Sequence, residues 1–420
     1  MSSAVEIRHV PVEDMIGWIR AMRTGLLANP SISGDAGLQW WAKIWEPERI
    51  TGGYADGRCV ATLRTFGVPM SVPTGEQTTT DIPIDALTQV SVAATHRRQG
   101  LLTRMLTQSL QDAKDRGEVA SLLRAAEWPI YGRFGYAPAS FASDYTIQTA
   151  AQPQILPPAT EYQVVQVEPV DLVAPAQAVY AEMRRQRAGH IERREANWQR
   201  RFDPACQEPG TREPVCVVVR NADGRVEGYA TWSAKEGDWF HDQLQHAQAD
   251  VTEALATTPD AYRALWGYLL NIDLVRVLKL NAYPVDEPLE WLISDGRTAR
   301  RTWTGDNEWL RLLDVPAALQ ARRYASTDRL VLDIVDNDGG WAQGRILLDG
   351  GPDHAECRPA AHDTPDLTLS QRALASIYQG GCTVRSQQLA GLLDEHTPRA
   401  AARLAAMFHT AQAPWNATPF

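Results

Sequence analysis

The segment from Val90 to Met105 contains the clearest set of ligand-binding groups in this chain. Val90 and Val92 alternate with a serine, a pattern typical of a strand, and a turn with two arginines follows them. Gly100 comes next, where a glycine lets the backbone approach a ligand closely, and Thr103 falls in the first turn of an apolar helix. The free amides and the dipole at the start of a helix bind anions. The segment therefore predicts a phosphate-binding turn.

This turn differs from two common phosphate motifs. No Gly-Lys-Ser/Thr follows it, as a P-loop requires, and it has one glycine where the dinucleotide fingerprint needs three. The run from Arg97 to Leu102 instead resembles the acyl-CoA binding motif of the GNAT superfamily of N-acetyltransferases, Gln/Arg-x-x-Gly-x-Gly/Ala, although Leu102 replaces the small residue. The structural alternative is a strand–turn–helix junction with surface arginines.

A second candidate segment runs from Trp128 to Tyr136 and combines aromatic residues, glycines and one arginine. The phenol of Tyr131 has a reference pKa of about 10, so it carries a proton at neutral pH. Such a group can protonate a departing thiolate, and general-acid catalysis contributes roughly 10²–10⁴ in rate. The alternative is an aromatic plug under a loop, with the glycines permitting a tight bend.

Taken together, these segments and the end of the chain resemble the Eis (enhanced intracellular survival) family of aminoglycoside acetyltransferases. The tail agrees in the run from Trp309 to Pro316, in Ala413-Pro-Trp, and in a phenylalanine, Phe420, as last residue. The resemblance covers nearly the whole chain. It implies two tandem acetyltransferase-like domains, the second degenerate, then a sterol-carrier-like domain, assembled as a homohexamer.

The resemblance also implies roles for individual residues. The cosubstrate is acetyl-CoA, Tyr131 is the general acid, and the terminal carboxylate of Phe420 is the general base. The residues implied to bind the cofactor are Val90, Ser91, Val92, Arg98, Gln99, Gly100, Leu101, Leu102, Thr103, Ala126 and Glu127. Those nearest the substrate are Trp40, Trp41, Gln89, Trp198 and Asp295.

The chemistry of a carboxylate independently suits the basic role. An amine arrives mostly as ammonium, and a carboxylate both attracts that cation and accepts its proton. A free α-carboxyl has a reference pKa of about 3.5, so burial or an acidic neighbour must raise it. The alternative for Phe420 is a frayed terminus, the usual fate of chain ends.

The residues implied to contact the substrate also have structural interpretations, and two positions depart from the family pattern. Trp40 and Trp41 equally suit helix packing. Gln89 replaces an aromatic residue that is common before the Val-x-Val strand, and Pro419 stands where the family often has an acid. Both departures lower the expected affinity for polycationic aminoglycosides.

The sequence pattern predicts that these residues are positioned by a duplicated α/β unit followed by an α+β unit. Asp56-Gly57 and Asp223-Gly224 are hairpin signals at a separation of roughly 160 residues, each after an amphipathic helix. The second unit has no counterpart of the basic turn. We predict a catalytic GNAT domain over 1–150, a degenerate GNAT-like domain over 151–302 and a sterol-carrier-like domain over 303–420, with a linker over 148–158.

The last domain shows strand patterns at Leu330 to Ile334 and Gly344 to Leu348. A helix capped by Ser370 is expected there, together with helices over Leu389 to Leu393 and Ala400 to Phe408.

Composition limits the remaining classes of protein. The net charge of −10 argues against a nucleic-acid partner, and no apolar run is long enough for a membrane span. Five scattered cysteines form no Cys-x-x-Cys pair, so no metal site is expected, and the N-terminus lacks a signal-peptide pattern, which favours the cytoplasm.

With the resemblance to the Eis family, we predict direct transfer of acetyl from acetyl-CoA to a small-molecule amine, either an aminoglycoside or a similar polyamine. One alternative is acetylation of lysine or N-terminal amines on peptides or proteins. Another is a lipid-binding carrier or scaffold whose acetyltransferase domain is inactive.

Overall fold

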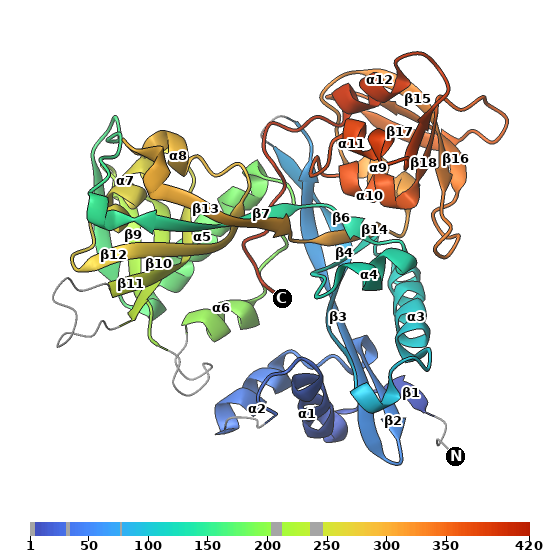
Figure 1. The fold of residues 1–420 in the computed structure, drawn as a ribbon, viewed down its shortest axis with the longest axis horizontal. Coiled ribbons are helices and arrows are strands. Elements are labelled where there is room, and N and C mark those ends of the chain that lie inside the picture. The colour runs from blue at the N-terminus through green and yellow to red at the C-terminus, as the bar shows by residue number, and fades with distance from the viewer. Residues whose placement is uncertain (1–4, 31–33, 76–77, 203–211, 236–246) are drawn as a thin grey trace.

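The computed structural model describes residues 5–30, 34–75, 78–202, 212–235 and 247–420. These residues form three lobes, each built on one β-sheet (Figure 1). Two lobes are α/β and the third is α+β, which confirms the predicted fold class.

The first lobe is built on a sheet of order β1-β2-β3-β4-β5-β14-β6. Its strands are β1 (Glu6–His9), β2 (Ile50–Ala55), β3 (Arg58–Pro73), β4 (Thr79–Val92), β5 (Ala120–Leu123), β6 (Ala137–Pro138) and β14 (Trp309–Leu312). Its helices are α1 (Met15–Gly25), α2 (Gly34–Lys43), α3 (Leu101–Asp115) and α4 (Trp128–Tyr131). The predicted turn at Asp56-Gly57 joins β2 to β3, with both residues at positive φ.

The second lobe has a sheet of order β13-β7-β12-β11-β10-β9-β8. Its strands are β7 (Phe141–Gln148), β8 (Tyr162–Val167), β9 (Val215–Asn221), β10 (Val226–Lys235), β11 (Ala247–Ala256), β12 (Val275–Pro284) and β13 (Ala299–Asp306). Its helices are α5 (Pro169–Gln186), α6 (Glu195–Phe202), α7 (Pro259–Leu270) and α8 (Leu289–Leu292). The parallel pair β11/β12 repeats the parallel pair β4/β5, as a duplicated unit predicts.

The first two lobes exchange strands. β7 follows the first lobe in sequence but lies between β12 and β13 of the second sheet, whereas β14 follows the second lobe and lies between β5 and β6. The segment expected to be a linker packs on the second lobe, where Ile155 forms a bridge with Ile293. The domain limits at 150 and 302 stay predictions, and β7 and β14 connect the units on either side of them.

The third lobe has a sheet of order β17-β16-β15-β18-β19. Its strands are β15 (Asp328–Val335), β16 (Gly344–Gly350), β17 (Ala355–Pro359), β18 (Leu367–Ser370) and β19 (Leu393–Glu395), and its helices are α9 (Val315–Ala321), α10 (Gln371–Ile377), α11 (Val384–Leu389) and α12 (Ala400–Met407). Ser370 caps α10 by accepting a hydrogen bond from the amide of Ala373, as predicted. The helix expected over Leu389 to Leu393 is wrong: Gly391 has φ +71°, and Leu393 begins a strand that pairs with β18.

The two faces of the first sheet pack against different neighbours. Phe66, Ala86 and Leu122 belong to an apolar core shared with the third lobe. Their alternating neighbours on the opposite face, including Leu87 and Leu123, pack under α3. None of the helices within the described ranges is long and apolar enough to cross a membrane.

Candidate active site

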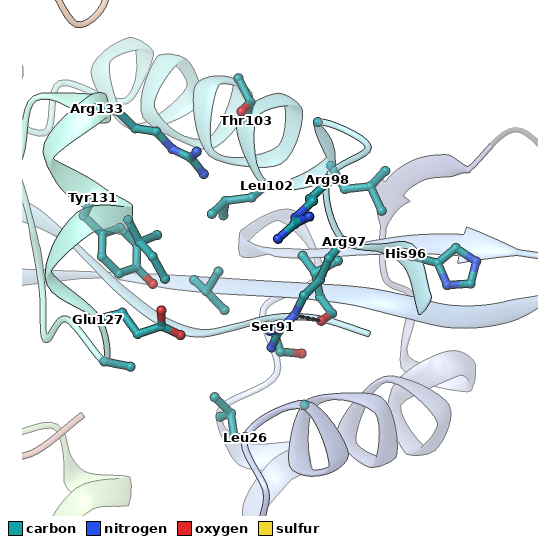
Figure 2. A pocket seen from close by; sticks show the side chains of 17 residues that line it. Leu26, Ser91, His96, Arg97, Arg98, Leu102, Thr103, Glu127, Tyr131 and Arg133 are labelled. Atoms are coloured by element: carbon teal, nitrogen blue, oxygen red, sulfur yellow. Dashed lines mark hydrogen bonds between the residues drawn. The ribbon is translucent and has the colours of Figure 1, made fainter. Parts of the chain in front are cut away.

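The central feature of the first lobe is a gap between β4 and β5. These parallel strands pair over Ile84–Ala86 and Ala120–Leu122, and the described pairing ends there. A cavity of about 660 Å³ opens beyond that point, between the last residues of β4, the start of α3 and the segment that leads to α4 (Figure 2). The edge of β4 that faces β5 is therefore available for backbone hydrogen bonds with a ligand.

Gln89 marks the place where β4 turns away. Its φ is +57°, and the register between β3 and β4 shifts there, so that Thr62 pairs with Ser91 while Arg64 pairs with Thr88. This is the geometry of a β-bulge, which re-aims the residues that follow it. Gln89 itself does not line the cavity; its carbonyl accepts from Thr62 at 2.9 Å.

The basic turn lies at the other end of the cavity. Gly100 has φ +73°, which favours glycine, and it precedes α3 as an N-cap residue that provides no side-chain hydrogen bond. The first amides of α3 are thus left for a ligand, and the guanidinium groups of Arg97, Arg98 and Arg133 line the same space. Free helix amides beside three cations fit a pyrophosphate group.

The corresponding helix of the second lobe is closed to such a ligand. At the start of α7, Thr258 accepts from the amide of Ala261 at 3.2 Å and donates to the carboxylate of Glu227 at 3.2 Å. The chain thus supplies both a cap and an anion at this terminus. The start of α7 therefore differs from the start of α3, which has no side-chain cap.

Tyr131 ends α4 on the wall of the cavity and is 7% exposed. Burial, with a smaller contribution from Glu127, raises the pKa of its phenol to about 12. Figure 2 shows the Tyr131 hydroxyl pointing into the space that Glu127 also lines. The phenol can therefore act as a proton or hydrogen-bond donor at neutral pH.

Most of the cofactor residues predicted from the sequence line this one cavity. They are Val90, Ser91, Val92, Arg98, Gly100, Leu101, Leu102, Thr103, Ala126 and Glu127, together with Tyr131. Gln99 lies in the turn but not on the cavity wall. The lining residues that the prediction omitted are Gly25, Leu26, His96, Arg97, Ile130 and Arg133.

The omitted residues differ in how far the sequence could have signalled them. Arg97 and Arg133 belong to the motifs already identified, and their charge could have marked them as anion ligands. The sequence around Gly25 gave no signal, because its role depends on close packing of its backbone against Ser91, which is distant in the sequence. A Cβ at Gly25 would lie 2.5 Å from the Cβ of Ser91.

The end of the chain is docked rather than frayed. It lies between the first two lobes (Figure 1), and the indole of Trp415 donates to the carbonyl of Ala282 at 2.7 Å. The ring of Phe420 packs edge-on against Phe66 at 5.7 Å between centroids. Phe66 lies on β3, where it pairs with Ala86 of β4, and Phe420 packs against the apolar core that contains both residues without lining the cavity. Phe420 therefore lies on the sheet face opposite to the Tyr131 side.

The remaining substrate-side residues lie elsewhere. Trp40 and Trp41 are buried in an aromatic cluster of the first lobe, where the Trp40 indole donates to the carbonyl of Ala196 at 3.3 Å. Trp198 is 3% exposed in the second lobe. Asp295 is exposed and caps a short turn by accepting from the amide of Arg297. Burial favours packing roles for the three tryptophans, and Asp295 acts as a turn cap; substrate roles for these residues stay predictions.

Comparison with known protein families identifies all three lobes. Two models described as acetyltransferase (GNAT) domains match residues 6–139 and 189–312, and a sterol carrier protein domain matches residues 315–417.

Individual relatives agree. An uncharacterized N-acetyltransferase of Streptomyces avermitilis is 36% identical over 419 residues, which are 98% of this chain and 97% of the relative. The N-acetyltransferase Eis of Mycobacterium tuberculosis is 32% identical over 304 residues, 71% of either chain. The crystal structure of Eis1 from Mycobacterium abscessus superposes with a TM-score of 0.82 at 29% identity, covering 99% of this chain and 100% of that one.

Proposed function

The chain belongs to the Eis family of GNAT-type N-acetyltransferases, and we propose that it transfers the acetyl group of acetyl-CoA to a primary amine of an aminoglycoside or similar polyamine. The observation that carries this proposal is the cavity at the unpaired end of β4, with the buried Tyr131 phenol on its wall; the docked chain end on the opposite face of the sheet supports it.

The residues of the cavity fit the parts of acetyl-CoA. Its pyrophosphate suits the uncapped start of α3 and the side chains of Arg97, Arg98 and Arg133. The free edge of β4 at Val90 to Val92 suits the amide-bearing pantetheine arm, which needs backbone partners. When bound, acetyl-CoA supplies an activated acyl thioester.

The chain's own groups handle the protons. The Tyr131 phenol holds its proton and donates toward the sulfur that leaves. The carboxylate of Phe420 attracts the incoming ammonium and accepts the proton that frees the nitrogen lone pair, either directly or through one water. Direct attack of the amine then needs no covalent enzyme intermediate, which agrees with the cavity lining: none of the described cysteines belongs to it.

The proposal is tested by offering the purified chain acetyl-CoA and three sets of acceptors: kanamycin-type aminoglycosides, polyamines, and lysine or N-terminal peptides. Thiol release and product mass are followed together. We expect aminoglycosides or polyamines to give acetylated products. Acetylation of peptides alone would show that the acceptors are peptide amines and not aminoglycosides or polyamines. If no acceptor is acetylated and calorimetry shows no binding of CoA, the lipid-carrier alternative is favoured. The homohexamer expected of the family is measured by light scattering.

A further inference from the structure

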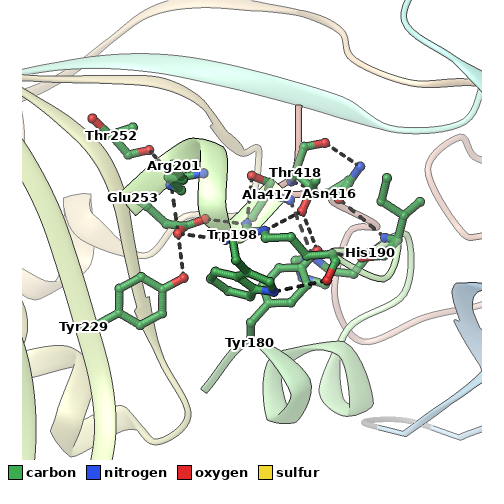
Figure 3. A network of polar contacts seen from close by, with 12 residues as sticks. Tyr180, His190, Trp198, Arg201, Tyr229, Thr252, Glu253, Asn416, Ala417 and Thr418 are labelled. Atoms are coloured by element: carbon green, nitrogen blue, oxygen red, sulfur yellow. Dashed lines mark hydrogen bonds and ion pairs between the residues drawn. The ribbon is translucent and has the colours of Figure 1, made fainter. Parts of the chain in front are cut away.

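The second lobe contains a buried polar network that surrounds the chain end and has no place in cofactor binding (Figure 3). Its core is the ion pair of Arg193 and Glu253, whose side chains are 1% and 2% exposed. Two hydrogen bonds of 2.8 and 3.2 Å join them, and the Tyr229 hydroxyl donates to Glu253 at 2.5 Å. Burial alone would raise the pKa of Glu253, but Arg193 and Arg201 lower it to about 2. The pair is therefore charged at all physiological pH values.

The network fixes the hydroxyl of Thr418, two residues before the terminus. Arg193 Nε donates to Thr418 Oγ1 at 3.1 Å, and Tyr180 Oη lies 2.7 Å from the same oxygen. Tyr180 donates its own proton to the carbonyl of Ile191 at 2.8 Å. Thr418 must then donate to Tyr180 while accepting from Arg193, so its hydroxyl is satisfied in both directions.

A second anchor fixes the residue two positions earlier. Asn416 donates to Glu308 at 2.6 Å, and its side-chain oxygen accepts from the amide of Thr418 at 3.0 Å. Arg124, which follows β5 on the way to the cavity wall, donates to the carbonyl of Asn416 at 3.3 Å. The ring of Pro419 restricts its own φ, and the Phe420 ring lies against Phe66.

We infer that Arg193 and Tyr180 of the second lobe, acting through Thr418, are positioning residues for the terminal carboxylate of Phe420. The inference rests on the proposed function, because it assigns the second lobe a part in that reaction. The second lobe thereby holds the end of the chain, whose terminal ring lies against Phe66 of β3. A polar hydroxyl at Thr418 is then needed for orientation, since valine has the same shape and cannot make either bond.

The test compares Thr418→Val with Thr418→Ser, which keeps both bonds, and with Thr149→Val as a matched control. Thr149 is 6% exposed in the same lobe and donates to the carbonyl of Val275 at 2.7 Å, away from the tail. Hydrogen exchange of the peptide over residues 414–420 is measured with kcat, KM and CoA binding. We expect Thr418→Val to speed exchange in that peptide about tenfold or more and to lower kcat about 10- to 100-fold, with CoA binding unchanged. Thr418→Ser recovers most of both properties, and Thr149→Val changes neither.

Unaltered exchange at the tail in Thr418→Val would refute the anchor, and loosened exchange with full kcat would refute the positioning role. If Thr418→Val does not fold, Tyr180→Phe removes one partner of the same hydroxyl, and the same criteria apply to it. Exchange needs no turnover, so failure of the wild-type chain to acetylate any amine would overturn the proposed function while the anchor is still measured.

Discussion

Replacing Tyr131 with phenylalanine removes one hydroxyl from the cofactor cavity and keeps the ring that packs against Tyr136. Burial, together with Glu127, raises the pKa of the Tyr131 phenol to about 12. Because this value lies above the pH of any ordinary assay, the phenol stays protonated throughout. A loss of kcat at alkaline pH should not arise from this residue below about pH 11.

The raised pKa also sets the size of the effect. A free thiol has a reference pKa of about 8.5, so complete transfer of the phenol proton to a thiolate is uphill by about 5 kcal/mol, at about 1.4 kcal/mol per pKa unit. Tyr131 then acts mainly as a hydrogen-bond donor to the developing thiolate. Such a bond to a charged group contributes about 1.5–3 kcal/mol, so Tyr131→Phe should lower kcat by about 10- to 150-fold.

Initial rates of thiol release from pH 6 to 10, with CoA affinity by calorimetry, measure this effect. Tyr136→Phe is the control, because it removes the same atom from a neighbouring buried ring that does not line the cavity. Wild-type kcat in Tyr131→Phe would remove the phenol from the mechanism. An alkaline loss of kcat with an apparent pKa near 10 (the reference value for tyrosine), present in the wild type and absent from Tyr131→Phe, would refute the raised pKa.

Two further substitutions test the cavity and the chain end. Arg98→Ala should weaken CoA binding about tenfold or more by loss of a charged contact, with kcat nearly unchanged. The control Arg104→Ala, on the exposed side of α3, should leave CoA binding unchanged. Equal CoA affinities of Arg98→Ala and the wild type in calorimetry would contradict the phosphate site. Burial raises the pKa of Glu308 to about 7 from a reference of 4.5, so the stability that depends on its protonated form is present below about pH 4.5 and is lost as the pH rises through 7. Glu308→Gln should therefore remove about 2 to 3 kcal/mol of the fall in unfolding free energy between pH 5 and pH 8, and identical urea curves for both proteins would contradict this.

Features encoded by adjacent residues were predictable from the sequence. The basic turn at Arg98 and Gly100, the hairpin at Asp56-Gly57 and the Ser370 cap each depend on a few consecutive side chains and on local backbone geometry. Such features can be predicted from a short stretch of sequence because they do not depend on a distant partner.

Features that depend on distant partners were not predictable in this way. The exchange of β7 and β14 pairs strands far apart in the sequence. The anchor of Thr418 needs Tyr180 and Arg193, more than 200 residues away. The predicted helix over Leu389 to Leu393 failed because pairing with β18 outweighs a short apolar pattern.

The most direct test of acetyl transfer between the Tyr131 phenol and the carboxylate of Phe420 is to append two glycines after Phe420. The extension moves the carboxylate and leaves every residue of the cofactor cavity in place. Acetyl-CoA turnover is measured with the acceptor that the wild-type chain acetylates, together with CoA binding by calorimetry. We predict unchanged CoA binding with turnover lost. Full turnover in the extended chain would contradict the account.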